Sequence, residues 1–323
     1  MRAMILAAGL GTRLRPLTYI RPKALVPILG TTVLDFWLSR LLSIGCAGVV
    51  VNAFHHPEKL IRAMQNRTLP IPSRVQVEEE LLGTGGGIRN VLDFFGAEPF
   101  VVVNGDVLSD APLKELYAQF LQMEVEAGLL LHDYAEFNNV AVDEGGWILG
   151  FGEEARKLAR ERADIRLLAF TGIQFLQPRV LQPLAGGQPA DIIAVYRDMI
   201  AAGRPPKAMS VPGLFWREMG SIDAYWALHR EMGTVPAGFL PPLQTGNHCR
   251  QHPTASVAAD VRLNGLVMVG AGSRVLSGSE LTNVIVWDDV TIEARSVLRN
   301  CLVTDGVTCS GCHEDEILLG AQA

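Results

Sequence analysis

The chain has 323 residues, of which 49% are hydrophobic, and its formal net charge is -6. This length and apolar content are sufficient to bury the core of one large domain and a smaller one. The acidic balance argues against a nonspecific nucleic-acid binder, which carries a basic surface. We therefore expect any phosphate-binding site to be local.

The amino-terminal stretch MRAMILAAGL is apolar but short. Glycines and the arginines Arg13 and Arg15 interrupt it well before the ~20 residues that a membrane span needs. We interpret it as a buried strand, because a signal peptide carries a small-residue cleavage site after a longer apolar region. The cysteines are few and scattered, which favours a reducing cytoplasm: Cys46, Cys249, Cys301, Cys309 and Cys312.

Strand-like and helix-like patterns alternate over the first half of the chain. Apolar runs bounded by turn residues predict strands at 3–8, 48–53, 74–78, 99–105 and 127–133. Helical spacing predicts helices over 33–42, 57–64 and 113–122. This alternation predicts an α/β fold with a parallel sheet covered on both faces, whose ligands bind beyond the carboxyl ends of the strands.

The rhythm then changes over residues 137–151, where two short apolar runs flank Gly145 and Gly146. This pattern predicts a hairpin that forms one wall of a substrate pocket. Helical patterns near 191–202 and 221–232 close the first domain, which we place at 1–235. The proline- and glycine-rich segment at 236–254 is predicted to be a linker.

Beyond the linker, aliphatic residues recur every six positions, with two slips of register. A repeat of six is typical of a β-helix whose flat faces each turn one aliphatic residue inward. We therefore predict a short, degenerate, left-handed β-helix of hexapeptide repeats over 255–323. Its inward residues are expected to be Val257, Leu263, Val269, Val275, Leu281, Val286, Ile292, Leu298, Val303 and Cys309.

The clearest chemical motif is LAAGLGTRLRPLT, residues 6–18, directly after the first strand. Gly9 and Gly11 allow the backbone to approach phosphate oxygens closely, and Arg13 can neutralise a leaving pyrophosphate. A dinucleotide motif needs a glycine where Leu14 stands, and the lysine of a P-loop is absent. A plain tight turn between a strand and a helix remains the alternative. The candidate nucleotide-binding residues here are Leu6, Ala8, Gly9, Gly11 and Thr12.

A second motif, RPKALVPILG at 21–30, places Lys23 between Pro22 and Pro27. The fixed φ angles of the two prolines stiffen the segment. A stiff loop can hold the Lys23 ammonium beside phosphates with little loss of conformational entropy.

Together the two motifs resemble the GxGTRLxPLT and PKxLxP signatures of the sugar-1-phosphate nucleotidylyltransferase family, also called NDP-sugar pyrophosphorylases. The resemblance runs over nearly the whole chain and is strongest to mannose- or heptose-1-phosphate guanylyltransferases and N-acetylmuramate-1-phosphate uridylyltransferases. It implies a Rossmann-like nucleotidyltransferase domain with a mixed, mainly parallel sheet. The matching positions are Leu6, Ala7, Gly9, Gly11, Thr12, Arg13, Leu14, Pro16, Leu17, Thr18, Pro22, Lys23 and Pro27.

The segment EEELLGTGGGIRNVL at 78–92 predicts a glycine-rich turn that opens a helix. Gly85, Gly86 and Gly87 are expected to leave a bare backbone surface for a planar base. The resemblance implies that Glu80, Gly83, Thr84 and Gly85 hold the nucleobase.

Asp106 stands at the carboxyl end of the strand at 99–105, which suits a ligand of Mg²⁺. The resemblance implies that Asp106 binds the metal, and that Glu218 supplies a second carboxylate. Glu218 replaces the family's aspartate, and Ser221 replaces its threonine. We expect Asp110 to cap a helix.

For the sugar, the resemblance points to Asn104, Thr171, Gly172 and Glu153. A lysine that relatives use for the sugar phosphate is missing. Arg156 or Lys157 is the expected substitute.

The implied reaction is attack of a sugar 1-phosphate on the α-phosphorus of a nucleoside triphosphate, with GTP or UTP favoured. Both substrates are already ionised, so Mg²⁺, Arg13 and Lys23 suffice and no general base is needed. A zinc site built from the carboxy-terminal Cys and His residues, including His248, is disfavoured by their spacing. The alternatives are a noncatalytic regulatory homologue and, more weakly, an acyltransferase. We expect no nucleic-acid or membrane partner, and a homo-oligomer formed through the β-helix.

Overall fold

The computed structural model describes residues 1–231, 244–245 and 249–321. Its contacts divide the chain into two compact units. The first unit comprises Met1–Leu10 and Trp37–Glu218, and the second comprises Gly11–Phe36 and Met219–Ala323. Most of the segment predicted to be a linker lies outside the described residues. Among the described helices, none has the length and apolar character that crossing a bilayer would require.

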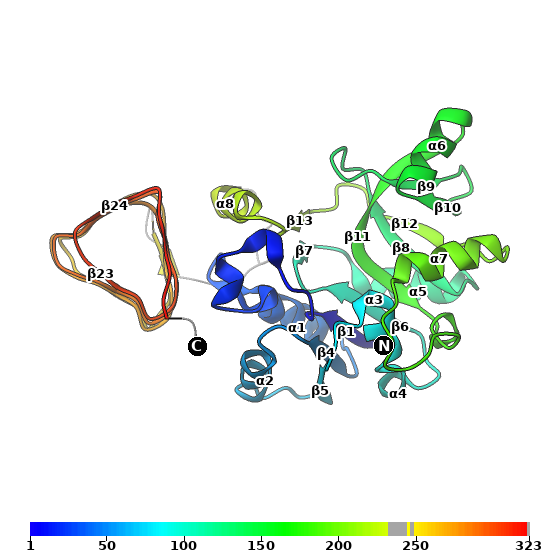
Figure 1. The fold of residues 1–323 in the computed structure, drawn as a ribbon, viewed down its shortest axis with the longest axis horizontal. Coiled ribbons are helices and arrows are strands. Elements are labelled where there is room, and N and C mark those ends of the chain that lie inside the picture. Colours follow the sequence, from blue (N-terminus) through cyan, green and yellow to red (C-terminus); the bar gives the residue numbers. More distant parts are fainter. Residues whose placement is uncertain (232–243, 246–248, 322–323) are drawn as a thin grey trace. The chain divides into compact units, whose positions relative to one another are not determined.

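The first unit is built on a mixed sheet of nine strands (Figure 1). Its parallel part has the order β5-β4-β1-β6 and contains the first four of the five predicted strands. Their bounds are β1 (Arg2–Leu6), β4 (Val49–Ala53), β5 (Ser73–Val77) and β6 (Phe100–Asn104). Their Val-rich sequences suit burial on both faces, and Val49–Val51 and Val101–Val103 are fully buried.

The long strand β11 (Arg166–Leu176) makes the sheet mixed, because it runs antiparallel to β6, β8 and β9. The remaining strands are β8 (Ala127–His132), β9 (Val140–Val142), β10 (Ile148–Phe151) and β12 (Lys207–Ser210). The predicted hairpin is confirmed as the antiparallel pair of β9 and β10. A separate two-stranded sheet joins β7 (Val107–Ser109) to β13 (Trp216–Glu218).

The predicted helices are present, with small differences at their ends. They are α1 (Val33–Ser43), α2 (Pro57–Gln65), α5 (Leu113–Gln122), α7 (Ile192–Ala201) and α8 (Ile222–Arg230). The helix expected to open within 78–92 is α3 (Gly83–Arg89), and the structure adds α4 (Leu92–Phe95), α6 (Glu153–Glu161) and the 3₁₀ helix η4 (Pro178–Val180). Ile88 of α3 and Tyr196 of α7 pack into one core cluster with Met4 of β1.

The second unit begins with a loop, residues 11–36, that contains three 3₁₀ turns and a small strand pair. These elements are η1 (Thr12–Leu14), η2 (Leu17–Tyr19), η3 (Lys23–Leu25), β2 (Pro27–Ile28) and β3 (Thr31–Thr32). Residues 249–321 form a stack of coils, which we call the coil stack. Figure 1 shows its three-sided outline.

Parallel pairing between successive turns builds the coil stack. Arg274 pairs with Thr291, and Thr291 pairs with Thr308, so each of these two central turns takes 17 residues. The predicted inward residues Leu281, Val286, Ile292 and Leu298 are buried in one cluster. A 17-residue turn must contain one step of five residues, which explains the slips of register in the sequence.

The strands of this unit are short and follow one another in a regular order. They are β14 (Gln244–Thr245), β15 (Cys249–Gln251), β16 (Ser256–Val257), β17 (Arg262–Val269), β18 (Arg274–Val275), β19 (Glu280–Val286), β20 (Thr291–Ile292), β21 (Val297–Arg299), β22 (Leu302–Val303), β23 (Thr308–Cys309), β24 (Cys312–Glu314) and β25 (Ile317–Leu318).

Candidate functional site

The glycine-rich motif starts where β1 ends. Leu6 pairs in register with Asn104 of β6, and the Gly105 amide donates a 2.8 Å hydrogen bond to the Leu6 carbonyl. The carboxyl ends of two parallel strands therefore lie side by side, as the α/β pattern predicts. This pairing places the start of the candidate phosphate loop beside the strand that leads to Asp106.

Gly11 takes a left-handed conformation, with φ of 59°, at the start of η1. A Cβ added to Gly11 would lie 2.6 Å from Cγ2 of Thr18 and 3.5 Å from Cβ of Lys23. The Thr18 hydroxyl also donates a 3.0 Å hydrogen bond to the Gly11 carbonyl. The structure thus brings Gly11 and Lys23 together and requires a glycine at position 11.

A buried polar chain connects the two candidate nucleotide-binding segments. The Ala7 amide donates to Oδ1 of Asn52 at 2.7 Å, and Nδ2 of Asn52 donates to Oε1 of Glu78 at 2.7 Å. The other Glu78 oxygen accepts a 3.0 Å hydrogen bond from the Leu82 amide. Asn52 and Glu78 are 3% and 4% exposed, so the chain lies inside the protein. It fixes the backbone of the glycine-rich motif at Ala7 and the backbone before α3 at Leu82.

The glycines of α3 have a different role from the one predicted. A Cβ on Gly85 or Gly86 would contact the backbone of residues 188–192, and a Cβ on Gly87 would lie 2.8 Å from Oε1 of Glu78. The expected bare surface over Gly85–Gly87 is therefore wrong, because the protein's own chain covers it. Gly83 and Glu80 remain exposed, and Thr84 is half-buried.

A cavity of ≈ 390 Å³ opens in the first unit beside the end of β6. It gathers Asp106 and Glu218 with three of the four residues predicted for the sugar. Its lining is Asn104, Asp106, Val107, Phe137, Asn139, Val140, Phe151, Gly152, Phe170, Thr171, Gly172, Ile193, Arg197, Trp216 and Glu218. The predicted hairpin contributes Val140 and Phe151 and is confirmed as one wall of a pocket.

The two carboxylates of this cavity come from paired strands. In the antiparallel pairing of β13 with β7, Glu218 lies opposite Val107, the residue after Asp106. Mg²⁺ is commonly held by one or two carboxylates, with substrate phosphates and water completing its shell. Asp106 and Glu218 fit that donor set. Within the described part of the chain, no group of three or more His, Cys, Asp or Glu side chains is placed to hold a metal ion.

Aromatic side chains shape the same cavity. Nε1 of Trp216 donates a 2.9 Å hydrogen bond to the Thr171 carbonyl, which fixes the indole over β11. The Phe137 ring meets Trp216 edge to face at 5.7 Å. These rings add an apolar surface to a cavity that also carries polar groups, which suits a sugar ring with its two kinds of surface.

Arg197 of α7 lines the cavity, although the sequence does not single it out. Its NH2 group donates to the Phe151 carbonyl at 3.4 Å, and its Nε lies 4.0 Å from a Glu154 oxygen. The predicted substitutes for the family's lysine, Arg156 and Lys157, are not part of the lining. Ile193, one turn earlier on the same face of α7, also lines the cavity, but this spacing alone does not distinguish Arg197 from an exposed arginine.

Two further expectations change at the edges of the site. Glu153 lies outside the cavity lining, at the start of α6, where it forms an ion pair with Arg156.

The prediction that Asp110 caps a helix is wrong: α5 begins without a side-chain cap. Asp110 instead accepts a 2.9 Å hydrogen bond from the Phe215 amide, which holds the strand that carries Glu218. His248, part of the disfavoured zinc cluster, lies outside the described residues.

The chain is similar to known proteins in sequence and in fold. A family model described as nucleotidyl transferase matches residues 2–234. The mannose-1-phosphate guanylyltransferase of Mycobacterium tuberculosis is 28% identical over 305 residues, which cover 92% of this chain and 82% of that protein. The UTP--glucose-1-phosphate uridylyltransferase of Synechocystis is 28% identical over 314 residues, covering 87% of this chain and 76% of its own.

A solved structure is similar in fold. The crystal structure of HddC from Yersinia pseudotuberculosis, complexed with GMP-PN, superposes with a TM-score of 0.58. The match covers 70% of this chain and 97% of HddC, at 19% sequence identity. At that identity the likeness concerns the fold alone.

Proposed function

Because the chain belongs to the nucleotidyl transferase family, we propose that it transfers a nucleoside monophosphate from GTP or UTP to a sugar 1-phosphate and releases pyrophosphate. The family match confirms the predicted resemblance and the expectation of an enzyme. The observation that carries the proposal is the cavity that gathers Asp106 and Glu218 with Asn104, Thr171 and Gly172. It combines a pair of carboxylates with a polar and aromatic wall.

The nucleotide is assigned to two segments. Leu6, Ala8, Gly9, Gly11 and Thr12 hold the triphosphate with their backbone, and Arg13 and Lys23 neutralise it. Glu80, Gly83 and Thr84 contact the base. The approach of Gly11 to Lys23 supports this assignment, and so does the fixed backbone at Ala7 and Leu82.

The sugar phosphate is assigned to the cavity of the first unit. Asn104, Thr171 and Gly172 face the hexose. Arg197 supplies the cation that neutralises the sugar's phosphate, in place of the family's lysine. This placement is supported by Arg197 lining the same cavity as Thr171.

In this mechanism the protein aligns two ionised substrates and neutralises their charge. A phosphate oxygen of the sugar attacks the α-phosphorus in line, and pyrophosphate leaves as Arg13 and Lys23 compensate its growing charge. Asp106 and Glu218 would hold Mg²⁺, which supplies charge neutralisation at the phosphates when bound. No side chain needs to remove a proton from the attacking oxygen.

The rest of the chain is assigned by the same reasoning. We propose that residues 1–235 act as the catalytic domain, that 236–254 link it to the rest, and that 255–323 form a left-handed hexapeptide-repeat β-helix through which copies associate. Such an enzyme would work in the cytoplasm and make nucleotide sugars for cell-envelope polysaccharides.

The test is to incubate the protein with Mg²⁺, each NTP in turn and a panel of sugar 1-phosphates, and to follow pyrophosphate. We expect release with GTP or UTP and at least one sugar 1-phosphate. Binding of nucleotide without release across the whole panel would instead support a noncatalytic regulatory homologue, which the replacement of aspartate by Glu218 favours.

A further inference from the structure

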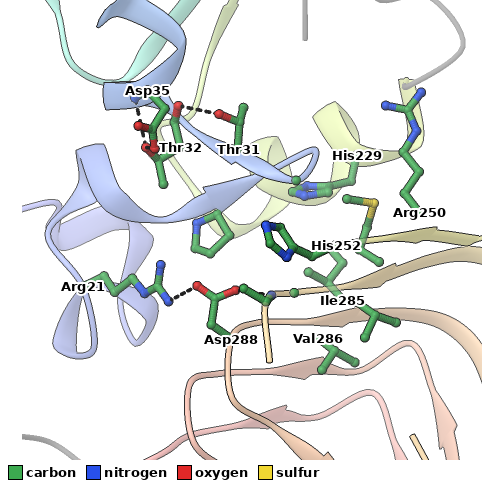
Figure 2. A pocket seen from close by; sticks show the side chains of 16 residues that line it. Arg21, Thr31, Thr32, Asp35, His229, Arg250, His252, Ile285, Val286 and Asp288 are labelled. Atoms are coloured by element: carbon green, nitrogen blue, oxygen red, sulfur yellow. Dashed lines mark hydrogen bonds and ion pairs between the residues drawn. The ribbon is translucent and has the colours of Figure 1, made fainter. Parts of the chain in front are cut away.

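Arg21 lies two residues before Lys23 and contacts the coil stack. Its Nε and NH2 groups donate to both carboxylate oxygens of Asp305, at 2.5 and 2.6 Å. NH2 also donates to Asp288 at 2.6 Å, as Figure 2 shows. Two carboxylates thus converge on one guanidinium whose side chain is only 19% exposed. Bidentate, partly buried pairs of this kind are the most directional ion pairs in proteins.

The same guanidinium closes the turn that carries Lys23. Its NH1 group donates to the Leu25 carbonyl at 3.4 Å, so the bond spans η3 from one end to the other. The guanidinium carbon also lies 5.5 Å from the centre of the Trp287 ring. Burial lowers the pKa of Arg21, but the hydrogen bonds and charges of Asp305 and Asp288 outweigh it, so that the pKa is raised overall.

The carboxyl-terminal end of this segment, at Pro27, is also linked to the coil stack, through Tyr225 and Trp287. The hydroxyl of Tyr225 donates a 2.7 Å hydrogen bond to the Pro27 carbonyl and accepts one of 3.1 Å from Nε1 of Trp287. Tyr225 and Trp287 are both fully buried. Trp287 therefore contacts the start of the segment through Arg21, and it is linked to the end of the segment, Pro27, through the Tyr225 hydroxyl.

The two aspartates are themselves fixed by neighbouring turns of the coil stack. Oδ1 of Asp288 accepts a 2.7 Å hydrogen bond from the Ala271 amide, and Oδ1 of Asp305 accepts one of 3.2 Å from the Asp288 amide. Residues 271, 288 and 305 follow one another at intervals of 17 positions. The two hydrogen bonds therefore join three successive turns of the coil stack at one corner. A movement of that corner would be passed to Arg21.

We propose that the coil stack is a positioning element for Lys23, acting through the clamp of Arg21 on Asp288 and Asp305. The inference rests on the proposed function, because it assigns the placement of the Lys23 ammonium to the carboxy-terminal residues. Arg21 is a positioning residue: it orders the turn, and Lys23 acts on the phosphates.

The test compares Asp305→Asn with Glu280→Gln in the full chain. Glu280 makes an ion pair of 2.5 Å with Arg262 on the surface of the same coil stack, so Glu280→Gln removes a matched charge away from the clamp. We expect Asp305→Asn to lower kcat roughly tenfold to a hundredfold and to raise KM for the NTP. KM for the sugar 1-phosphate should stay within about twofold of the wild-type value, and Glu280→Gln should leave all three constants unchanged.

A double variant separates positioning from general stability. If Asp305 acts through Lys23, Asp305→Asn should have no further effect on kcat in a Lys23→Ala background. Independent, multiplicative losses in the two variants would overturn the inference. A wild-type protein that is inactive with every substrate pair would overturn the proposed function instead.

Limited trypsin digestion tests the clamp without turnover. Asp305→Asn should speed cleavage after Lys23, whereas Glu280→Gln should not, because the turn opens only when Arg21 loses a partner. Arg21→Lys serves if Asp305→Asn does not fold, since it keeps the charge but loses the bidentate geometry. Cleavage after Lys23 at the wild-type rate in a folded clamp variant would contradict the clamp.

Discussion

Asn52 donates a hydrogen bond of 2.7 Å to the buried carboxylate of Glu78 while it accepts another from the Ala7 amide. Replacing Asn52 with alanine leaves the Ala7 amide and one Glu78 oxygen without these partners. An unsatisfied buried group costs about 1–3 kcal/mol, so we expect Asn52→Ala to lower the free energy of unfolding by roughly that amount or more. Urea denaturation measures it.

Nucleotide affinity should fall in the same variant, because Asn52 fixes the start of the phosphate loop. Gln119→Ala is the matched control, since Gln119 is exposed on α5. If Asn52→Ala unfolds at the same urea concentration as Gln119→Ala and binds nucleotide normally, the polar chain has no role in either property.

The two glycines of the phosphate loop separate folding from binding. Gly11→Ala places a Cβ 2.6 Å from Thr18 at a positive φ, and we expect it to destabilise the protein by about 1–2 kcal/mol from the backbone conformation alone. Gly9 has no atom within 4 Å of an added Cβ. Gly9→Ala should therefore melt like the wild-type protein.

Nucleotide binding gives the second half of this comparison. If phosphates approach the backbone at Gly9, Gly9→Ala should weaken the binding of Mg²⁺ and GTP or UTP without loss of stability. Calorimetric titration measures this affinity. Unchanged affinity in Gly9→Ala would mean that the triphosphate does not pack against this residue.

Arg197 is expected to recognise the phosphate of the sugar. A charge-assisted hydrogen bond contributes about 1.5–3 kcal/mol, so Arg197→Gln should raise KM for the sugar 1-phosphate roughly tenfold or more. Steady-state kinetics at saturating NTP measures this. Arg156→Gln is the control, because Arg156 pairs with Glu153 outside the cavity lining. If Arg156→Gln raised KM for the sugar 1-phosphate and Arg197→Gln did not, Arg156 would be the residue that binds the sugar's phosphate.

His229 predicts a pH dependence of stability. Complete burial lowers its pKa from 6.5 to about 4, and its Nε2 accepts a 3.2 Å hydrogen bond from the Leu29 amide. Between these pH values the unfolded chain binds a proton that the folded chain excludes. The stabilisation is therefore complete above pH 6.5 and is lost as the pH falls towards 4, by on the order of 3 kcal/mol.

The measurement is the free energy of unfolding between pH 4 and 7 for the wild-type protein and for His229→Gln. Carboxylates titrate in both proteins, so the difference between the two slopes isolates His229. We expect the variant to show the shallower dependence. Parallel curves would contradict the assignment of a neutral, buried imidazole.

Local features of the site were predictable from the sequence, and features set by distant contacts were not. The turn at Gly11 and the strand ending before Asp106 follow from residues close together in the chain. Arg197 lies on a helix 91 residues after Asp106, and no local pattern distinguishes it from an exposed arginine. Asp110 precedes a helix, as a cap would, but its partner Phe215 is distant in the chain and lies just before β13.

The role of the glycines in α3 also could not be predicted from nearby residues. The run at Gly85–Gly87 is compatible with a ligand surface and with close packing, because both need a backbone without Cβ. Only the positions of residues 188–192 and Glu78 decide between them. In the coil stack, by contrast, the inward residues follow from their spacing alone, since each turn repeats the same small set of positions.

The most direct test of the proposed reaction is the fate of the α-phosphate. The wild-type protein is incubated with α-phosphate-labelled GTP or UTP, Mg²⁺ and hexose 1-phosphates, and the products are separated by chromatography. We predict that the label moves into a nucleotide sugar with one pyrophosphate released per product, and that EDTA abolishes the transfer. Label that stays in the NTP, or appears only in free nucleotide with every sugar 1-phosphate, would contradict the account.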